Sequence, residues 1–102
     1  MNTSEVTVVR IYCSEQSGQY PELLEWLHDQ EHVAGLTAFR GIAGFGGSGR
    51  IHQASLLDLS LDLPIIIEFF DRRDKVAAIM QHLQSRVAPG HMVSWEARAN
   101  LD

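Results

Sequence analysis

The chain has 102 residues, of which 45% are hydrophobic and 21% charged, and this fits one folded domain of ordinary globular composition. Its formal net charge of −5 argues against a general nucleic-acid binder, because such proteins need a basic face. The single cysteine, Cys13, excludes an intrachain disulfide, and no apolar run is long enough to span a bilayer. We therefore expect a single domain over residues 1–102, located in the cytoplasm.

The first part of the chain predicts a strand, a helix and a second strand. Residues 6–13, VTVVRIYC, are β-branched and aromatic, which is typical of a strand. Residues 21–34 predict a helix that begins with a proline and is stopped by Gly35. Residues 36–44, LTAFRGIAG, predict a strand that enters a glycine-rich loop. The apolar residues at helical spacing are Leu23, Leu24, Leu27 and Ala34.

The second part predicts a long connection followed by strand, helix and strand. The connection, residues 44–62, is longer than most loops of compact domains, and such loops are often functional. Residues 63–70, LPIIIEFF, predict a third strand, after which Asp71 is an expected helix N-cap. Residues 91–100 predict the last strand. The helix between them has an apolar stripe of Val76, Ile79, Met80, Leu83 and Val87.

The order β-α-β-β-α-β predicts an α+β, ferredoxin-like sandwich, in which two helices cover one face of a four-stranded antiparallel sheet. The third predicted strand is apolar on both faces, and the first is nearly so. The uncovered sheet face is therefore too apolar to be left in water, and we expect a homo-oligomer.

The glycine-rich segment GFGGSG, residues 44–49, matches the letters G-x-G-x-x-G. No helix signal follows it and the chain is too short for a doubly wound dinucleotide-binding fold, so that interpretation is rejected. The segment also lacks the lysine and hydroxyl residue of a P-loop. Two interpretations stay open: a loop whose glycines supply positive φ, or a nest of backbone N–H groups that holds an anion between Arg40 and Arg50.

The histidines supply two alternative hypotheses. His28 and His32 are four residues apart in the predicted helix and, together with His52, are candidate ligands of a metal-responsive trimer of the copper-tolerance type. In the other alternative, His52 or His91 is the general base of a small enzyme. Because no acid–base pair, nucleophile motif or third metal ligand is evident, we expect no catalytic residue, no resident metal and no required cofactor.

Four blocks of sequence carry a family resemblance. They are VRIYCSE, which ends at Glu15, GLTAFRGIAGFG at residues 35–46, DLPIIIEFFD at residues 62–71, and the tryptophan-containing last strand. From about residue 5 to residue 100 the chain resembles the bacterial family known as domain of unknown function 190, which in turn is similar to the PII signal-transduction proteins and their PII-like relatives. The resemblance implies a ferredoxin-like trimer with a long T-loop at residues 47–62.

The resemblance also implies where an effector binds. In PII proteins adenine nucleotides lie in clefts between subunits, and a Gly-Phe-Gly sequence at the end of the second strand helps to hold the phosphates. Gly44, Phe45 and Gly46 match that sequence, and Leu63 and Pro64 match the Leu-Pro before the third strand. The residues that we therefore expect to contact a small anionic effector are Arg40, Gly44, Phe45, Gly46, Gly47 and Arg50, with Gly90, His91 and Arg98 from a neighbouring loop and strand.

Three departures limit the resemblance. The loop before the last strand, RVAPGHMV, has one glycine and no lysine, Ile65 stands where PII proteins have lysine, and residues 47–62 contain no tyrosine. These differences weaken the case for triphosphate binding and for nitrogen sensing. The expectation is a PII-like regulator with an adenine-nucleotide effector, which signals through the T-loop to a partner such as a membrane channel or transporter.

Overall fold

The computed structural model describes residues 2–15, 18–45, 51–53 and 63–101. This part of the chain contains two helices and six strands. In chain order they are β1 (Ser4–Ser14), α1 (Gln19–Asp29), β2 (Gly35–Arg40), β3 (Ala43–Phe45), β4 (Ile51–Gln53), β5 (Pro64–Arg72), α2 (Arg73–Leu83) and β6 (Met92–Ala99).

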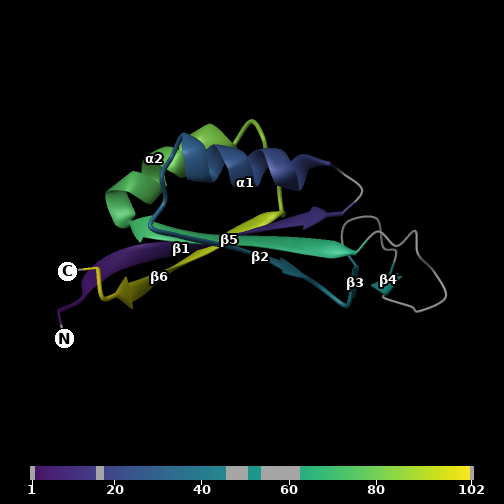
Figure 1. The fold of residues 1–102 in the computed structure, drawn as a ribbon, viewed down its shortest axis with the longest axis horizontal. Coiled ribbons are helices and arrows are strands. Elements are labelled where there is room, and N and C mark those ends of the chain that lie inside the picture. Colours follow the sequence, from purple (N-terminus) through teal and green to yellow (C-terminus); the bar gives the residue numbers. More distant parts are fainter. Residues whose placement is uncertain (1, 16–17, 46–50, 54–62, 102) are drawn as a thin grey trace.

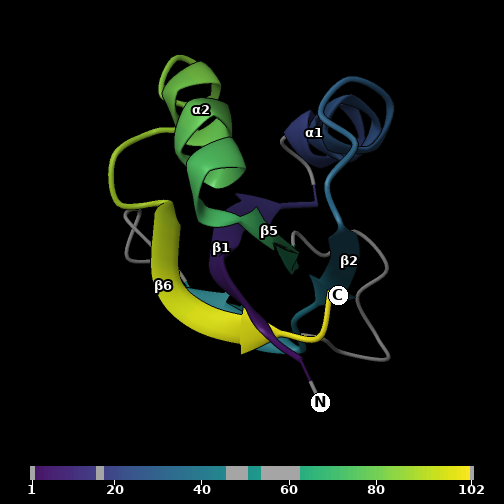
Figure 2. The same ribbon diagram turned by 90° about the vertical axis from the view of Figure 1, so that its left-hand side faces the viewer.

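The main sheet has four antiparallel strands in the order β2-β5-β1-β6. Both helices lie on the same side of this sheet, and the other side is uncovered (Figures 1 and 2). The short strands β3 and β4 pair with each other at one end of the molecule. The prediction of a ferredoxin-like βαββαβ sandwich is thus confirmed.

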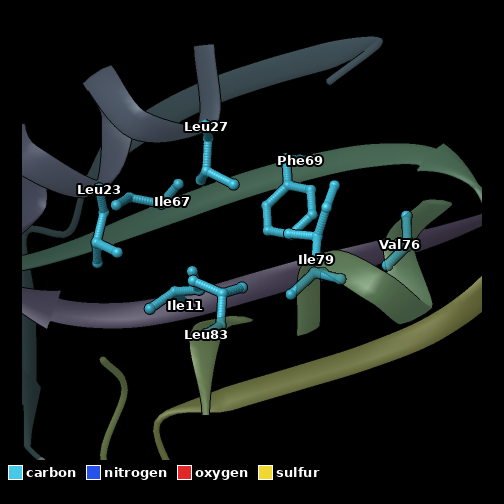
Figure 3. Close-up of a cluster of buried hydrophobic side chains, with 9 residues drawn as sticks. Ile11, Leu23, Leu27, Ile67, Phe69, Val76, Ile79 and Leu83 are labelled. Carbon is cyan, nitrogen blue, oxygen red and sulfur yellow. The ribbon is translucent and has the colours of Figure 1, made fainter. Parts of the chain in front are cut away.

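The core lies between the helices and the central strands β1 and β5 (Figure 3). Alternate residues of the strands point toward the helices, because side chains alternate between the faces of a sheet. Each of the two helices contributes most of the apolar stripe that the sequence predicts. Ala34 and Val87 are exceptions, because α1 ends at Asp29 and α2 already at Leu83. The fully buried cluster consists of Val9, Ile11, Leu23, Leu27, Ile67, Phe69, Val76, Ile79 and Leu83.

The first helix is shorter than predicted. It ends at Asp29, and His32 follows it with a positive φ of 51°. The expectation that His28 and His32 share one helix face is therefore wrong. Gly35 does not cap the helix but opens β2. The predicted second strand is also interrupted, because β2 ends at Arg40 and β3 begins only at Ala43.

Asp71 is the last buried residue of β5 and not the predicted N-cap, since Arg72 holds that position without a side-chain capping bond. The Asp71 carboxylate instead accepts hydrogen bonds from the amide of Ala34 at 3.0 Å and from that of Arg72 at 2.7 Å. It also pairs with the Lys75 ammonium at 2.8 Å. Asp71 thereby ties the start of α2 to the segment that enters β2.

Candidate functional site

The predicted effector residues begin at the sheet end where β1 and β2 finish and β5 and β6 start. Because neighbouring strands run antiparallel, this one end gathers Tyr12, Arg40, Pro64 and His91. The pair β3–β4 extends from the same end, on the right of Figure 1. The chain therefore places the described start of its glycine-rich segment beside four strand termini.

Arg40 is the last residue of β2 and its side chain is largely exposed. Its guanidinium Nη2 donates to Oε1 of Glu15, which follows the end of β1. The amide of Glu15 donates to the carbonyl of Leu63 at 2.9 Å. A cation thus stands where the sequence predicts one, but it already has an anionic partner within the chain.

Close contact with Pro64 explains two of the glycines. The Gly41 amide donates to the Pro64 carbonyl at 2.8 Å. A Cβ on Gly41 would lie 2.7 Å from Pro64 Cγ, and one on Gly44 would lie 3.3 Å from the same atom. Among the described glycines only Gly18 and Gly90 have positive φ, so Gly44 serves packing rather than an unusual backbone conformation.

The remaining residues of the segment have a limited description. Phe45 is the last residue of β3. Gly46, Gly47 and Arg50 lie outside the described residues, as do residues 54–62. The predicted connection at 44–62 is thus described only at its start and at the strand β4.

Gly90 and His91 stand beside the end of β1. Gly90 has a φ of 84° with open space around its Cα, so it is needed for the turn before β6. The His91 carbonyl accepts from the Tyr12 amide at 2.8 Å, and its ring Nδ1 lies 3.2 Å from the Tyr12 carbonyl oxygen. This places an exposed imidazole at the same end as Arg40.

Arg98 lies near the opposite end of the sheet, where it is paired in register with Glu5. Most of β6 separates it from His91, and that length of chain corresponds to about 23 Å at the usual rise of a strand. There it lines a shallow groove of about 250 Å³ with Glu5, Glu96 and Ala97. One chain therefore does not bring Arg98 to the other predicted effector residues.

The uncovered side of the main sheet, which we call the open face, is largely apolar. Four of its large side chains, Tyr12, Phe39, Val93 and Trp95, are 38–44% exposed. Strand register places further apolar side chains between them on the same face. The apolar members of the open face include Val6, Val8, Tyr12, Phe39, Ile66, Phe70, Val93, Trp95 and Ala97.

An ion pair lies in the middle of the open face, and the sequence analysis did not identify it. Arg10 Nε and Glu68 Oε1 are 2.8 Å apart on directly paired positions of β1 and β5. The Arg10 guanidinium also lies 5.5 Å from the centre of the Trp95 ring, and its contact with Glu68 raises its pKa. An opposite-charge pair at cross-strand positions was the available signal, but it requires the register to be known.

The described residues of the alternative sites are dispersed. His28 Nδ1 contacts Asp29 Oδ1 at 2.7 Å, and His32 lies beyond the helix. His52 is the middle residue of β4. In the part of the chain that the structure describes, no group of three or more His, Cys, Asp or Glu residues could hold a metal ion.

Burial raises the pKa of the Cys13 thiol.

No helix in the described segments is long and apolar enough to cross a membrane. This agrees with the lack of a long apolar run in the sequence.

Solved structures of PII-like proteins share this fold. CPII, a nitrogen regulatory PII-like protein from Thiomonas intermedia K12, matches with a TM-score of 0.67 and 15% identity over 98% of this chain and 100% of that chain. That structure is bound to ADP, AMP and bicarbonate. A protein of Thermus thermophilus described as PII-like matches with a TM-score of 0.65 and 17% identity over 97% of this chain and 91% of that chain. The class of fold is therefore PII-like.

The chain belongs to the DUF190 family, described as "Uncharacterized ACR, COG1993", whose model matches residues 6–99. Among curated proteins it is similar to the UPF0166 protein of Aquifex aeolicus (strain VF5), with 28% identity over 91 residues. That match covers 84% of this chain and 86% of the relative. The family resemblance that the sequence blocks carried is thus confirmed.

Proposed function

We propose that this chain is a non-catalytic, PII-like regulator that binds a small anionic effector, an adenine nucleotide, in clefts between the subunits of a homotrimer. The observation that carries the proposal is the placement of Arg40 and Gly44 at one end of a PII-like sheet, where the glycine-rich segment begins. CPII, which has a similar fold, is bound to ADP, AMP and bicarbonate in its solved structure. This supports a ligand of the same class for the present chain.

The open face supports the trimer. The apolar side chains that gather on one uncovered sheet face favour burial against further copies of the chain. Assembly also accounts for Arg98, because a neighbouring subunit is the simplest source of an arginine that one chain keeps about 23 Å from His91. In this proposal the other residues of the cleft are Arg40, Gly44, Phe45, Gly46, Gly47, Arg50, Gly90 and His91.

The proposed output is a change in residues 47–62. An effector that binds two states of this segment with different affinity shifts their populations, and a partner that recognises one state then reads the effector concentration. We propose a membrane channel or transporter as that partner. The proposed setting is the cytoplasm, where adenine nucleotides are available to the site.

Isothermal titration calorimetry with AMP, ADP, ATP and cyclic nucleotides, on protein shown by light scattering to be trimeric, tests the proposal. We expect Arg98→Gln to weaken binding by about tenfold or more, since hydrogen bonds to charged groups contribute about 1.5–3 kcal/mol. Arg86→Gln is the matched control, because Arg86 stacks on Trp26 in the helix layer at 4.7 Å. No heat of binding from any nucleotide would reject an adenine-nucleotide effector.

A further inference from the structure

We propose that Glu15 is an internal competitor of the effector: its carboxylate occupies the Arg40 guanidinium that an effector phosphate must take, and Glu15 thereby sets the affinity of the site. This inference rests on the proposed function and adds its regulation. It starts from the contact between Arg40 Nη2 and Glu15 Oε1 at the end of the sheet where the glycine-rich segment begins.

The contact spans a strand rather than joining neighbours. Glu15 follows β1 and Arg40 ends β2, and β5 lies between these two strands in the sheet. Backbone hydrogen bonds fix both sides, because the Glu15 amide donates to the Leu63 carbonyl and the Gly41 amide donates to the Pro64 carbonyl. The two side chains therefore meet across the start of β5.

The side chains of Glu15 and Arg40 differ in how much of their surface is exposed to solvent. The Glu15 side chain is 25% exposed, whereas that of Arg40 is 62% exposed. The carboxylate is thus the more enclosed partner, and the guanidinium is the one that can turn toward a ligand. A guanidinium binds carboxylate and phosphate with the same planar fork of donors, so the two anions compete for one set of N–H groups.

Replacing the Glu15 carboxylate by an effector phosphate at the Arg40 guanidinium costs little free energy. An ion pair this exposed contributes little to stability, because water screens it. A phosphate carries more charge than a carboxylate, and it takes the guanidinium with charge-assisted hydrogen bonds. Effector binding then breaks the pair and frees Glu15, whose amide is bonded to Leu63, directly after the segment 47–62.

Calorimetry with ADP on the intact protein tests the competition. We expect Glu15→Gln and Glu15→Ala to bind ADP about two- to fivefold more tightly than the unchanged protein, which is the range that a weak surface pair allows. Glu25→Gln, an exposed change of the same charge on α1, is the matched control and should leave the affinity unchanged. The alanine variant is included because a glutamine oxygen can still accept from Arg40.

A double-mutant cycle assigns the effect to Arg40. If Glu15 acts through the guanidinium, Glu15→Ala has no effect on ADP affinity in an Arg40→Gln background. An equal gain in both backgrounds would overturn the inference, and so would unchanged or weaker binding by both Glu15 variants. In those cases the unchanged protein still binds ADP and the proposed function stands, whereas no binding of any adenine nucleotide by the unchanged protein or by any variant would overturn both.

Discussion

At the scale of single residues, Asp71 has the clearest energetic role. Burial by itself would raise the pKa of its carboxyl group, but hydrogen bonds from Lys75 and from the amides of Arg72 and Ala34 outweigh this and hold the pKa below its usual value of 3.8. Lys75 also donates to the His32 carbonyl at 2.8 Å. The ionised carboxylate therefore stabilises the chain where α1 leads into β2.

Replacing Asp71 by Asn should lower the free energy of unfolding by about 1–3 kcal/mol at neutral pH, because the hydrogen-bonded charge is lost. A lowered pKa in the folded state means that this stability is present above pH 3.8 and is lost as the pH falls toward the folded-state value. Urea denaturation at equal protein concentration should thus show a difference in unfolding free energy between the unchanged protein and Asp71→Asn, and this difference should become smaller in acid.

An exposed acid provides the control for Asp71. Asp29→Asn, at the end of α1, should change the unfolding free energy by less than about 0.5 kcal/mol, as is usual for surface sites. A gap between wild type and Asp71→Asn that stays constant from neutral pH to well below pH 3.8 would contradict the role given to the ionised carboxylate.

Gly41 provides a second prediction at this scale. A Cβ at this position would lie 2.7 Å from Pro64 Cγ, and overpacking of this kind typically costs about 1–3 kcal/mol, so Gly41→Ala should lower the melting temperature. Pro64→Ala in the same chain should restore part of the loss by removing the ring. Gly44→Ala, with 3.3 Å available, should cost less. Equal losses for both glycines would refute the packing explanation.

Some of these residues could be predicted from the sequence and others could not. Arg40 and Gly44 were identified because the glycine-rich motif is local in the chain. Glu15 belongs to one of the family blocks, but nothing near it in the sequence indicates its partner Arg40, which is 25 residues away. The contacts of Asp71 with Ala34 likewise join positions 37 residues apart. Spacing along a sequence does not specify such contacts, since they depend on how the strands are ordered in the sheet.

At the scale of elements, the approach of β2 to β5 depends on Gly35. A Cβ on this residue would overlap Phe70 Cε1, so the aromatic ring covers the space that a side chain would need. Gly35→Ala should therefore destabilise the edge strand β2, by about 1–3 kcal/mol. Relative to the unchanged protein, Gly35→Ala should speed up amide hydrogen exchange more in β2 than in the central strand β1.

Replacing the Phe70 ring by a smaller side chain is the control for Gly35→Ala. Gly35→Ala combined with Phe70→Leu should recover part of the stability, because leucine leaves room at the strand interface. If the double variant is no more stable than Gly35→Ala alone, the clash with Phe70 does not determine why glycine is required at this position.

Element types were more predictable than element ends. The strands and helices of the main fold were all predicted, because hydrophobic periodicity reports burial. The break between β2 and β3 was missed, since it depends on Pro64, which is distant in sequence from Gly41. The end of α1 was placed too late because Ala34 continues the apolar spacing, although its amide donates to Asp71 instead of continuing the helix.

At the scale of the whole molecule, the open face is the surface that the proposed trimer would bury. The pair Arg10–Glu68 lies among apolar side chains and is stacked beside Trp95. Burial of that face would bring the pair out of water with its charges already matched, which avoids the large cost of burying an unpaired charge. The face is thus compatible with self-association and disfavours partners that carry a net charge.

A single carboxylate on the open face should separate the subunits. Phe39 is 43% exposed and is paired with Ile66, one position along the face from Glu68, so Phe39→Glu places a second negative charge near an existing one in an apolar surround. Light scattering should show a mass near one chain of 11.4 kDa instead of three such chains. Gln81→Glu, the same charge change on an exposed position of α2, should leave the mass at three chains. If Phe39→Glu also remains trimeric at micromolar concentration, the subunits do not meet through this face, and the cleft proposed for the effector must be sought at a different surface.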